Sequence, residues 1–186
     1  MKYIDTHAHY NDEVFKDNLD EVLDKCKQTG VDYIVNIGYN KESSDRSLEL
    51  ANKYSYIYTT IGVHPHDVGN DKAIDIYDIY QANSNNKKIV GIGEIGLDYH
   101  YDTPSKEKQI HYFESFLKLA TQYQKPVIIH CRDAYLDTFQ LLEKYHKQLD
   151  GIILHCYSGS VEMMQRFLKL GCYISISGVV TFKNAK

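Results

Sequence analysis

The sequence has no tryptophan, only three prolines and no long apolar run. Every apolar stretch is shorter than the roughly 18 residues that a membrane-spanning helix needs, so we expect no membrane association. The N-terminus leads directly into Asp5 and Asp12, without the apolar core of a signal peptide. We therefore expect a cytoplasmic protein.

The sequence also lacks closely spaced cysteine pairs and an excess of positive charge. The four cysteines lack the C-x-x-C spacing of zinc sites, and reduced, mostly buried thiols are expected. The formal net charge of −4 argues against a broad binding surface for duplex nucleic acid. It leaves room for a smaller site that holds one phosphate through a metal ion.

Strand and helix patterns alternate along the whole chain, and its 186 residues predict a single domain over residues 1–186. Strands are expected at 3–4, 31–38, 56–63, 88–94, 126–130, 152–155 and 172–176. Helices are expected at 12–29, 42–53, 73–83, 134–148 and 160–170. A further helix should open with Thr103 as N-cap and Pro104 at its first position.

Such alternation with short connections predicts an α/β fold with a parallel sheet, either doubly wound or a TIM-type barrel. The count of seven strands is one βα step short of a closed (β/α)8 barrel. Residues 181–186 read as the start of another helix. We therefore predict a TIM-type (β/α)8 barrel whose last βα step is missing, so that the domain is incomplete at its C-terminus.

The first expected strand ends in two histidines, His7 and His9. Side chains two positions apart on a strand point to the same side, so the two imidazoles should project together. They would form half of a metal site. Taken alone, the pattern is short and more typical of two histidines in a surface turn than of a metal site.

Further metal-ligating residue types follow the other strands. His64 and His66 follow the third strand, Glu94 ends the fourth, His130 the fifth and His155 the sixth. The carboxyl ends of the strands form one face of a parallel barrel, so these side chains should meet there. Such a set indicates a metal site for borderline ions such as Zn²⁺ or Mn²⁺, whereas Mg²⁺ prefers more oxygen ligands.

Two ions would need a bridging ligand, and Glu94 is the candidate because both its oxygens can coordinate. A pair of ions activates water for attack on a phosphoryl or acyl group, which indicates a hydrolase. Nucleophilic catalysis by Cys131 or Cys156 is the competing hypothesis, since each follows a histidine of this set. Strand alternation argues against it, because it turns both thiols toward the helices.

Five segments closely resemble the TatD family, the metal-dependent deoxyribonucleases with an amidohydrolase-like TIM barrel. The resemblance runs from residue 3 to residue 182 in the family's order and rests on Thr6-His7-Ala8-His9, Gly62-Val63-His64-Pro65-His66, Gly93-Glu94-Ile95-Gly96-Leu97-Asp98-Tyr99, Ile129-His130-Cys131-Arg132-Asp133-Ala134 and Leu154-His155-Cys156-Tyr157-Ser158-Gly159. Five such motifs together are far more specific than any one of them.

The resemblance implies five metal ligands, His7, His9, Glu94, His130 and His155, with Glu94 between two metal positions. It implies hydrolysis of DNA phosphodiester bonds, often from the 3′ end, with two divalent ions such as Mg²⁺, Mn²⁺ or Zn²⁺. DNA would be the partner, as single strands or frayed ends, and no protein partner is indicated.

The resemblance also suggests residues outside the ligand set. His64 matches a family histidine near the site, and we expect it to act with Glu94 in catalysis by contacting a phosphate or leaving group. Arg132 and Tyr157 are candidate substrate contacts, although an Arg132–Asp133 surface pair and a packed tyrosine explain them equally well. His66, His100, His111 and His146 are expected to be structural or solvent-exposed.

One departure from the family pattern concerns an aspartate that ends strand eight in a Thr-Asp-x-Pro-like motif. The present sequence contains no residue for that position. A truncated inactive relative is therefore one alternative to the nuclease hypothesis. The other is a metal-dependent ester or amide hydrolase, such as an aminoacyl-ester deacylase, because water activated by two ions also hydrolyses esters and amides.

Overall fold

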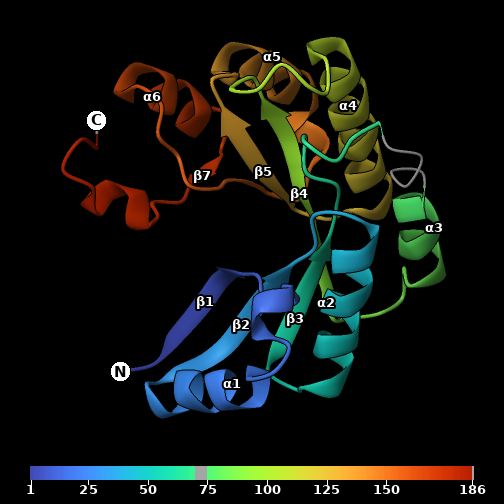
Figure 1. Ribbon diagram of the computed structural model, residues 1–186. Coiled ribbons are helices and arrows are strands. Elements are labelled where there is room, and N and C mark those ends of the chain that lie inside the picture. The colour runs from blue at the N-terminus through green and yellow to red at the C-terminus, as the bar shows by residue number, and fades with distance from the viewer. Residues whose placement is uncertain (70–74, 186) are drawn as a thin grey trace.

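Seven parallel strands in sequence order form one sheet in the part of the chain that the computed structural model describes, residues 1–69 and 75–185 (Figure 1). The strands are β1 (Tyr3–Ala8), β2 (Val31–Ile37), β3 (Ile57–Ile61), β4 (Ile89–Asp98), β5 (Val127–Arg132), β6 (Ile152–Leu154) and β7 (Tyr173–Ile174). The helices are α1 (Leu19–Gln28), α2 (Lys41–Lys53), α3 (Asp75–Ala82), α4 (Lys106–Tyr123), α5 (Tyr135–Tyr145) and α6 (Val161–Lys169).

The sheet is curled, and the helices lie along its outer side (Figure 1). Neighbouring strands pair in parallel from β1 to β7, so β1 and β7 are the two edges of the described sheet. The predicted TIM-type fold with seven strands and six connecting helices is therefore confirmed. Every strand points its carboxyl end the same way, which brings the residues that follow the strands to one face.

The hydrophobic core between sheet and helices consists of two clusters. The larger includes Phe113, Phe116 and Leu142 of the helices against the buried residues of β4 and β5. The smaller is formed by residues of β1, β2, β3, α1 and α2, namely Ala8, Leu23, Ile34, Ala51 and Ile57. Strands covered on both faces read as almost continuous apolar runs, which explains the clear strand signal at β4.

Strand β4 is longer than predicted, because it continues past Glu94 to Asp98. The prediction stopped at the first charged residue. Ile95 and Leu97 are fully buried, and residues 95–98 pair with β5, so the strand continues through the polar positions. Glu94 consequently lies in the middle of β4 and not at its end, which corrects the prediction.

The start of α4 also differs from the prediction. The N-cap is Ser105, whose hydroxyl accepts a hydrogen bond from the backbone N–H of Lys108, and the helix begins at Lys106. Thr103 and Pro104 therefore precede the helix. A serine hydroxyl three residues before a free N–H is an equally good cap, and the sequence offered both.

The bounds of other elements differ from the predicted bounds by a few residues or more. The predicted helix at 12–29 is a single 3-10 turn, Glu13–Phe15, followed by α1. The predicted strand at 172–176 is only Tyr173–Ile174, and Gly178–Thr181 form a 3-10 turn where a helix from 181 was expected. Residues 73 and 74 of another predicted helix lie outside the described residues. Within 1–69 and 75–185, no helix combines the length and apolar character needed to cross a bilayer.

Candidate metal centre

The two histidines at the end of β1 converge as their spacing predicts. Their Nε2 atoms lie 3.2 Å apart. Nδ1 of His9 lies 3.3 Å from the backbone carbonyl of Ile37, an acceptor, so Nδ1 carries the proton. The Nε2 lone pair of His9 is then directed toward His7, as in histidines whose second nitrogen is fixed for metal binding.

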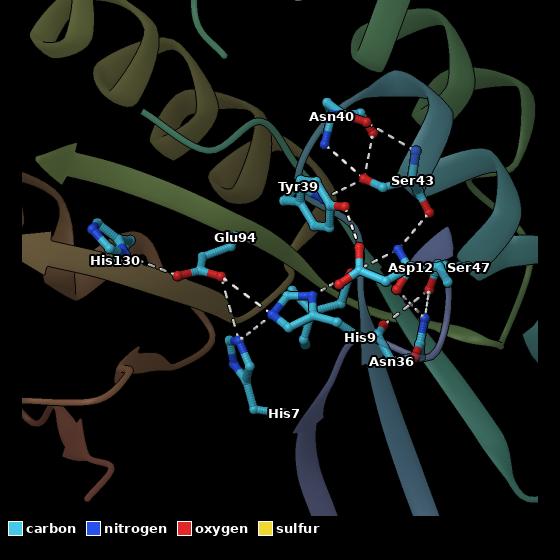
Figure 2. Close-up of polar contacts among 12 residues, drawn as sticks. His7, His9, Asp12, Asn36, Tyr39, Asn40, Ser43, Ser47, Glu94 and His130 are labelled. Atoms are coloured by element: carbon cyan, nitrogen blue, oxygen red, sulfur yellow. Dashed lines mark hydrogen bonds and ion pairs between the residues drawn. The ribbon is translucent and has the colours of Figure 1, made fainter. Parts of the chain in front are cut away.

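Glu94 of β4 lies between His130 on one side and His7 and His9 on the other (Figure 2). Its Oε2 atom is 3.3 Å from His7 Nε2 and 3.9 Å from His9 Nε2. Its Oε1 atom is 3.0 Å from Nδ1 of His130 on β5. The carboxylate is 5% exposed, so each oxygen depends on these imidazoles in place of water.

The position of His130 follows from strand register. His130 pairs with Gly96 of β4, midway between Glu94 and Asp98. Its second nitrogen, Nε2, is 2.9 Å from Oδ2 of Asp98, so the imidazole lies between two carboxylates. A Cβ on Gly96, where φ is +143°, would come 2.0 Å from the carbonyl oxygen of His130. The close approach of the two strands therefore requires glycine.

The surroundings of Glu94 and His130 favour the charged form of each side chain. Burial alone would raise the pKa of Glu94, but hydrogen bonds with His130 and His7 outweigh it and hold that pKa well below its usual range. Burial likewise opposes protonation of His130, yet Glu94 and Asp98 raise its pKa above the ordinary value. The carboxylate of Glu94 is thus ionised at neutral pH and available to a cation.

His64 and His155 lie beside this cluster. The His64 ring is 4.3 Å from the His130 ring in an edge-to-face arrangement, and the His155 ring stacks on His7 with centroids 3.4 Å apart. Burial, reinforced by neighbouring histidines, lowers the pKa of each to about 4. Both rings are therefore neutral at pH 7, the form in which imidazole binds metals.

Sequence reasoning missed Asp98 and gave His66 no part in the site. Asp98 is 1% exposed, and Oδ2 accepts from His130 and lies 3.1 Å from Nε2 of His66. Its backbone is fixed by Gln109 of α4, which bonds both its N–H and its carbonyl. Glu94, Gly96 and Asp98 lie on one side of β4, and this alternation in the sequence could have identified Asp98 as part of the site. The predicted strand ended at Glu94, so the alternation was not recognised.

A buried polar network supports the β1 side of the site (Figure 2). The amide of Asn36 on β2 accepts from the backbone N–H of Tyr10 and donates to the hydroxyl of Ser47 on α2. The Tyr39 hydroxyl donates to Asp12, and its ring packs edge-to-face against His9, with centroids 5.4 Å apart. The network fixes the chain directly after His9, and so the direction of its imidazole.

The donor set fits divalent ions in two places. His7, His9 and Glu94 form one group of ligand atoms within 4.8 Å of one another, and His64, Glu94 and His130 form another. In the first group, two imidazole nitrogens and a carboxylate oxygen converge, and both donor types bind borderline divalent ions. His155 adjoins the first group through its contact with His7.

The competing hypothesis of a cysteine nucleophile finds no support in the thiol environments. Cys131 is buried and contacts the Thr138 hydroxyl of α5, and burial raises its pKa to about 12. Cys156 is half-buried and contacts Ser177. All four cysteines are free, and of these Cys131 and Cys172 are buried, whereas Cys26 and Cys156 are half-buried.

The predicted substrate contacts have different surroundings. Arg132 is exposed at the end of β5, and its guanidinium carbon lies 5.7 Å from the centre of the Tyr101 ring. Asp133 lies 3.1 Å from His100, a partner other than the suggested Arg132. The hydroxyl of Tyr157 donates to the carbonyl of Ser160, and its ring packs against Phe167, which matches the packing role.

Comparison with known proteins gives consistent results. A family model described as TatD related DNase matches residues 4–186. The metal-dependent hydrolase YabD of Bacillus subtilis is 38% identical over 182 residues, which cover 98% of this chain and 71% of YabD. The 3′-5′ ssDNA/RNA exonuclease TatD of Citrobacter rodentium is 37% identical over 161 residues, covering 87% of this chain and 61% of that protein.

A solved structure shows the same fold. The crystal structure of YjjV, a TatD homologue from Escherichia coli, matches with a TM-score of 0.91 and 32% identity, over 99% of this chain and 71% of that one. The chain thus spans between 61% and 71% of the length of these three relatives. Because the family model matches nearly all of it, the chain belongs to the TatD related DNase family of metal-dependent hydrolases.

Proposed function

We propose that this chain hydrolyses phosphodiester bonds of DNA as an exonuclease on single-stranded or frayed ends, using two divalent ions. The proposal is carried by one observation, that the two oxygens of Glu94 face separate histidine groups. A carboxylate placed in this way can bridge two metal ions. Several relatives named 3′-5′ ssDNA/RNA exonuclease support the substrate class.

The ligand assignment follows from the same contacts. His7, His9 and Glu94 Oε2 would hold one ion, with His155 next to it, while Glu94 Oε1 and His130 would hold the other. Bound ions would acidify a water molecule and neutralise charge on the phosphate oxygens. Mn²⁺, Zn²⁺ and Mg²⁺ are all candidates, and the histidine-rich donor set favours the first two.

His64 suits contact with the substrate better than metal ligation. The backbone N–H of His66 lies 3.3 Å from its Nδ1, so Nδ1 acts as the acceptor and Nε2 carries the proton. A neutral imidazole with a free Nε2–H donates a hydrogen bond to a phosphate or leaving-group oxygen. We assign this role to His64, and charge pairing with the phosphate backbone to the exposed Arg132.

The test is release of nucleotides from a 3′-labelled single-stranded oligonucleotide with Mn²⁺, compared with the same strand labelled at its 5′ end. Glu94→Gln and His130→Ala should each lower turnover by at least about a hundred-fold, because each removes a ligand next to the reacting phosphate. Circular dichroism should show both variants folded. His146→Ala is the matched control, since His146 lies in the 3-10 turn after α5 and its side chain hydrogen-bonds the backbone carbonyl of Glu143.

Different results would overturn different parts of the proposal. Full activity of Glu94→Gln would remove the bridging carboxylate from the mechanism. Hydrolysis of an aminoacyl or nitrophenyl ester without nucleotide release would favour the ester hydrolase alternative. Mn²⁺ binding by calorimetry with no turnover on either substrate class would favour the inactive relative.

A further inference from the structure

The segment between β4 and α4 holds an aromatic ring at the edge of the metal centre. Tyr101 is 53% exposed, and its ring contacts three other side chains. The rings of His66 and His100 meet it nearly at right angles, with centroids 5.0 Å and 4.9 Å away. The guanidinium of Arg132 lies 5.7 Å from the ring centre. The ring is therefore fixed in position while about half of its surface stays open to solvent.

A short chain of contacts joins this ring to the centre. His66, which contacts Tyr101, lies 3.1 Å from Oδ2 of Asp98, and the same oxygen is 2.9 Å from His130. The rings of His66 and His130 are 6.4 Å apart. The side chain of His66 alone thus separates Tyr101 from the proposed ligand His130. The part of a substrate adjacent to the group bound at the metal centre would therefore lie near Tyr101.

Two other tyrosines near this face, Tyr99 and Tyr157, donate hydrogen bonds through their hydroxyl groups. The Tyr99 hydroxyl donates to Asp137, and the Lys106 ammonium covers its ring. Tyr157 is bonded to the Ser160 carbonyl and packed on Phe167. Among the described residues the Tyr101 hydroxyl has no hydrogen-bond partner, and the neighbours of its ring are two imidazoles and a guanidinium.

We propose that Tyr101 stacks on the nucleobase next to the phosphate held at the metal centre. Stacking on an exposed aromatic ring recognises single-stranded nucleic acid without sequence preference, because every base has a π face. Arg132 beside the ring supplies the cation that commonly accompanies such stacking. The inference rests on the proposed nuclease function and adds a base-binding subsite to it. It also explains how an acidic chain holds a single strand without a broad basic surface.

The direct test uses an oligonucleotide with 2-aminopurine at its 3′ end and hydrolysis-resistant phosphorothioate linkages, mixed with protein and Zn²⁺ so that the phosphate is held at the metal centre but not cleaved. Stacking quenches the fluorescence of this base. Quenching is expected with the unmodified chain and with Tyr101→Phe, and it should disappear with Tyr101→Ala. Tyr33→Ala is the matched control, because Tyr33 is similarly exposed, at 47%, but lies near the amino-terminal end of β2. Equal quenching by Tyr101→Ala and Tyr33→Ala would overturn the proposal.

Kinetics give a second, independent readout. With a normal single strand and Mn²⁺, Tyr101→Ala should raise KM about ten-fold and leave kcat within about two-fold, because stacking contributes to binding. With abasic residues at the 3′ end, the KM ratio between Tyr101→Ala and the unmodified chain should fall toward one. A ratio that is the same on both substrates would show that the ring does not contact a base.

The two proposals fail in different ways. Quenching that depends on Tyr101 with no metal-dependent hydrolysis would remove the nuclease function and retain the base-binding subsite. Normal hydrolysis without any quenching would remove the subsite and retain the nuclease function. Loss of quenching in Tyr101→Phe would assign the effect to the hydroxyl and contradict stacking.

Discussion

At the scale of single residues, the site depends on histidines that stay neutral in a crowded, buried setting. Burial and nearby imidazoles lower the pKa of His64 and His155 to about 4. Protonating them would place several positive charges within contact of His7 and His130. The same features that keep lone pairs available for a metal therefore make the folded chain sensitive to acid.

The thermal stability of the metal-free chain should fall as the pH is lowered from 6.5 to 4. In this window the unfolded histidines take up protons that the folded His64 and His155 exclude, so the free energy of unfolding decreases. For His64, the difference between 6.5 and about 4 corresponds to roughly 3 kcal/mol. The raised pKa of His130 acts in the opposite direction, but its contribution is complete below pH 6.5 and is lost only above it.

The measurement is the unfolding midpoint by circular dichroism in EDTA at several pH values from 4 to 7. His64→Gln should show a weaker pH dependence than the unmodified chain, because its side chain does not titrate. His111→Gln, a change at an exposed histidine on α4, should leave the dependence as it was. If the unfolding midpoint of His64→Gln depended on pH as steeply as that of the unmodified chain, the burial of His64 would not cause the loss of stability in acid.

At the scale of elements, the parallel strands and their helices could be predicted because apolar periodicity decides them. Seven strands and six helices lie close to their predicted ranges, and five predicted histidines and Glu94 lie close together at one face. The predictions failed where tertiary contacts override local signals. Strand β4 continues through Glu94 and Asp98 because β5 pairs with it and buries the residues between, a fact that no short window contains.

Gly96→Ala should damage both stability and metal binding. The added methyl group would meet the His130 carbonyl, and the backbone of Gly96 has a positive φ that alanine rarely adopts. The cost is expected to be on the order of 2–4 kcal/mol, from crowding and strain together. Calorimetric Mn²⁺ affinity should fall as well, because His130 would shift away from Glu94.

Urea unfolding and titration with Mn²⁺ check this prediction. Gly178→Ala is the matched control, since a Cβ there has no atom within 4 Å, and it should change stability by less than about 0.5 kcal/mol. A Gly96→Ala variant as stable as the control would show that β4 and β5 can separate at little cost.

At the scale of the whole molecule, the described sheet has two edges, β1 and β7, with exposed apolar side chains. Ile4 on β1 is 60% exposed, and Tyr173 on β7 is 71% exposed. Unpaired strand edges with apolar residues are templates for pairing with another chain. The chain of 186 residues should therefore self-associate as its concentration rises.

Sedimentation velocity at several concentrations tests this expectation. The double variant Ile4→Lys, Tyr173→Lys should shift the distribution toward monomer, because lysine on an edge strand opposes pairing. Leu136→Lys is the matched control, since Leu136 is also exposed, at 53%, but lies on α5. Equal association of the double variant and the control would show that the edges are not responsible.

The division of the core into two clusters has a consequence for how the chain unfolds. His7 and His9 extend from the strand that covers the smaller cluster, while Glu94 and His130 belong to strands of the larger one. An ion shared by these ligands would close a long loop of the chain and restrict the unfolded state, as a cross-link does. Metal content would then decide whether the two parts of the core melt together in one cooperative transition or separately in two.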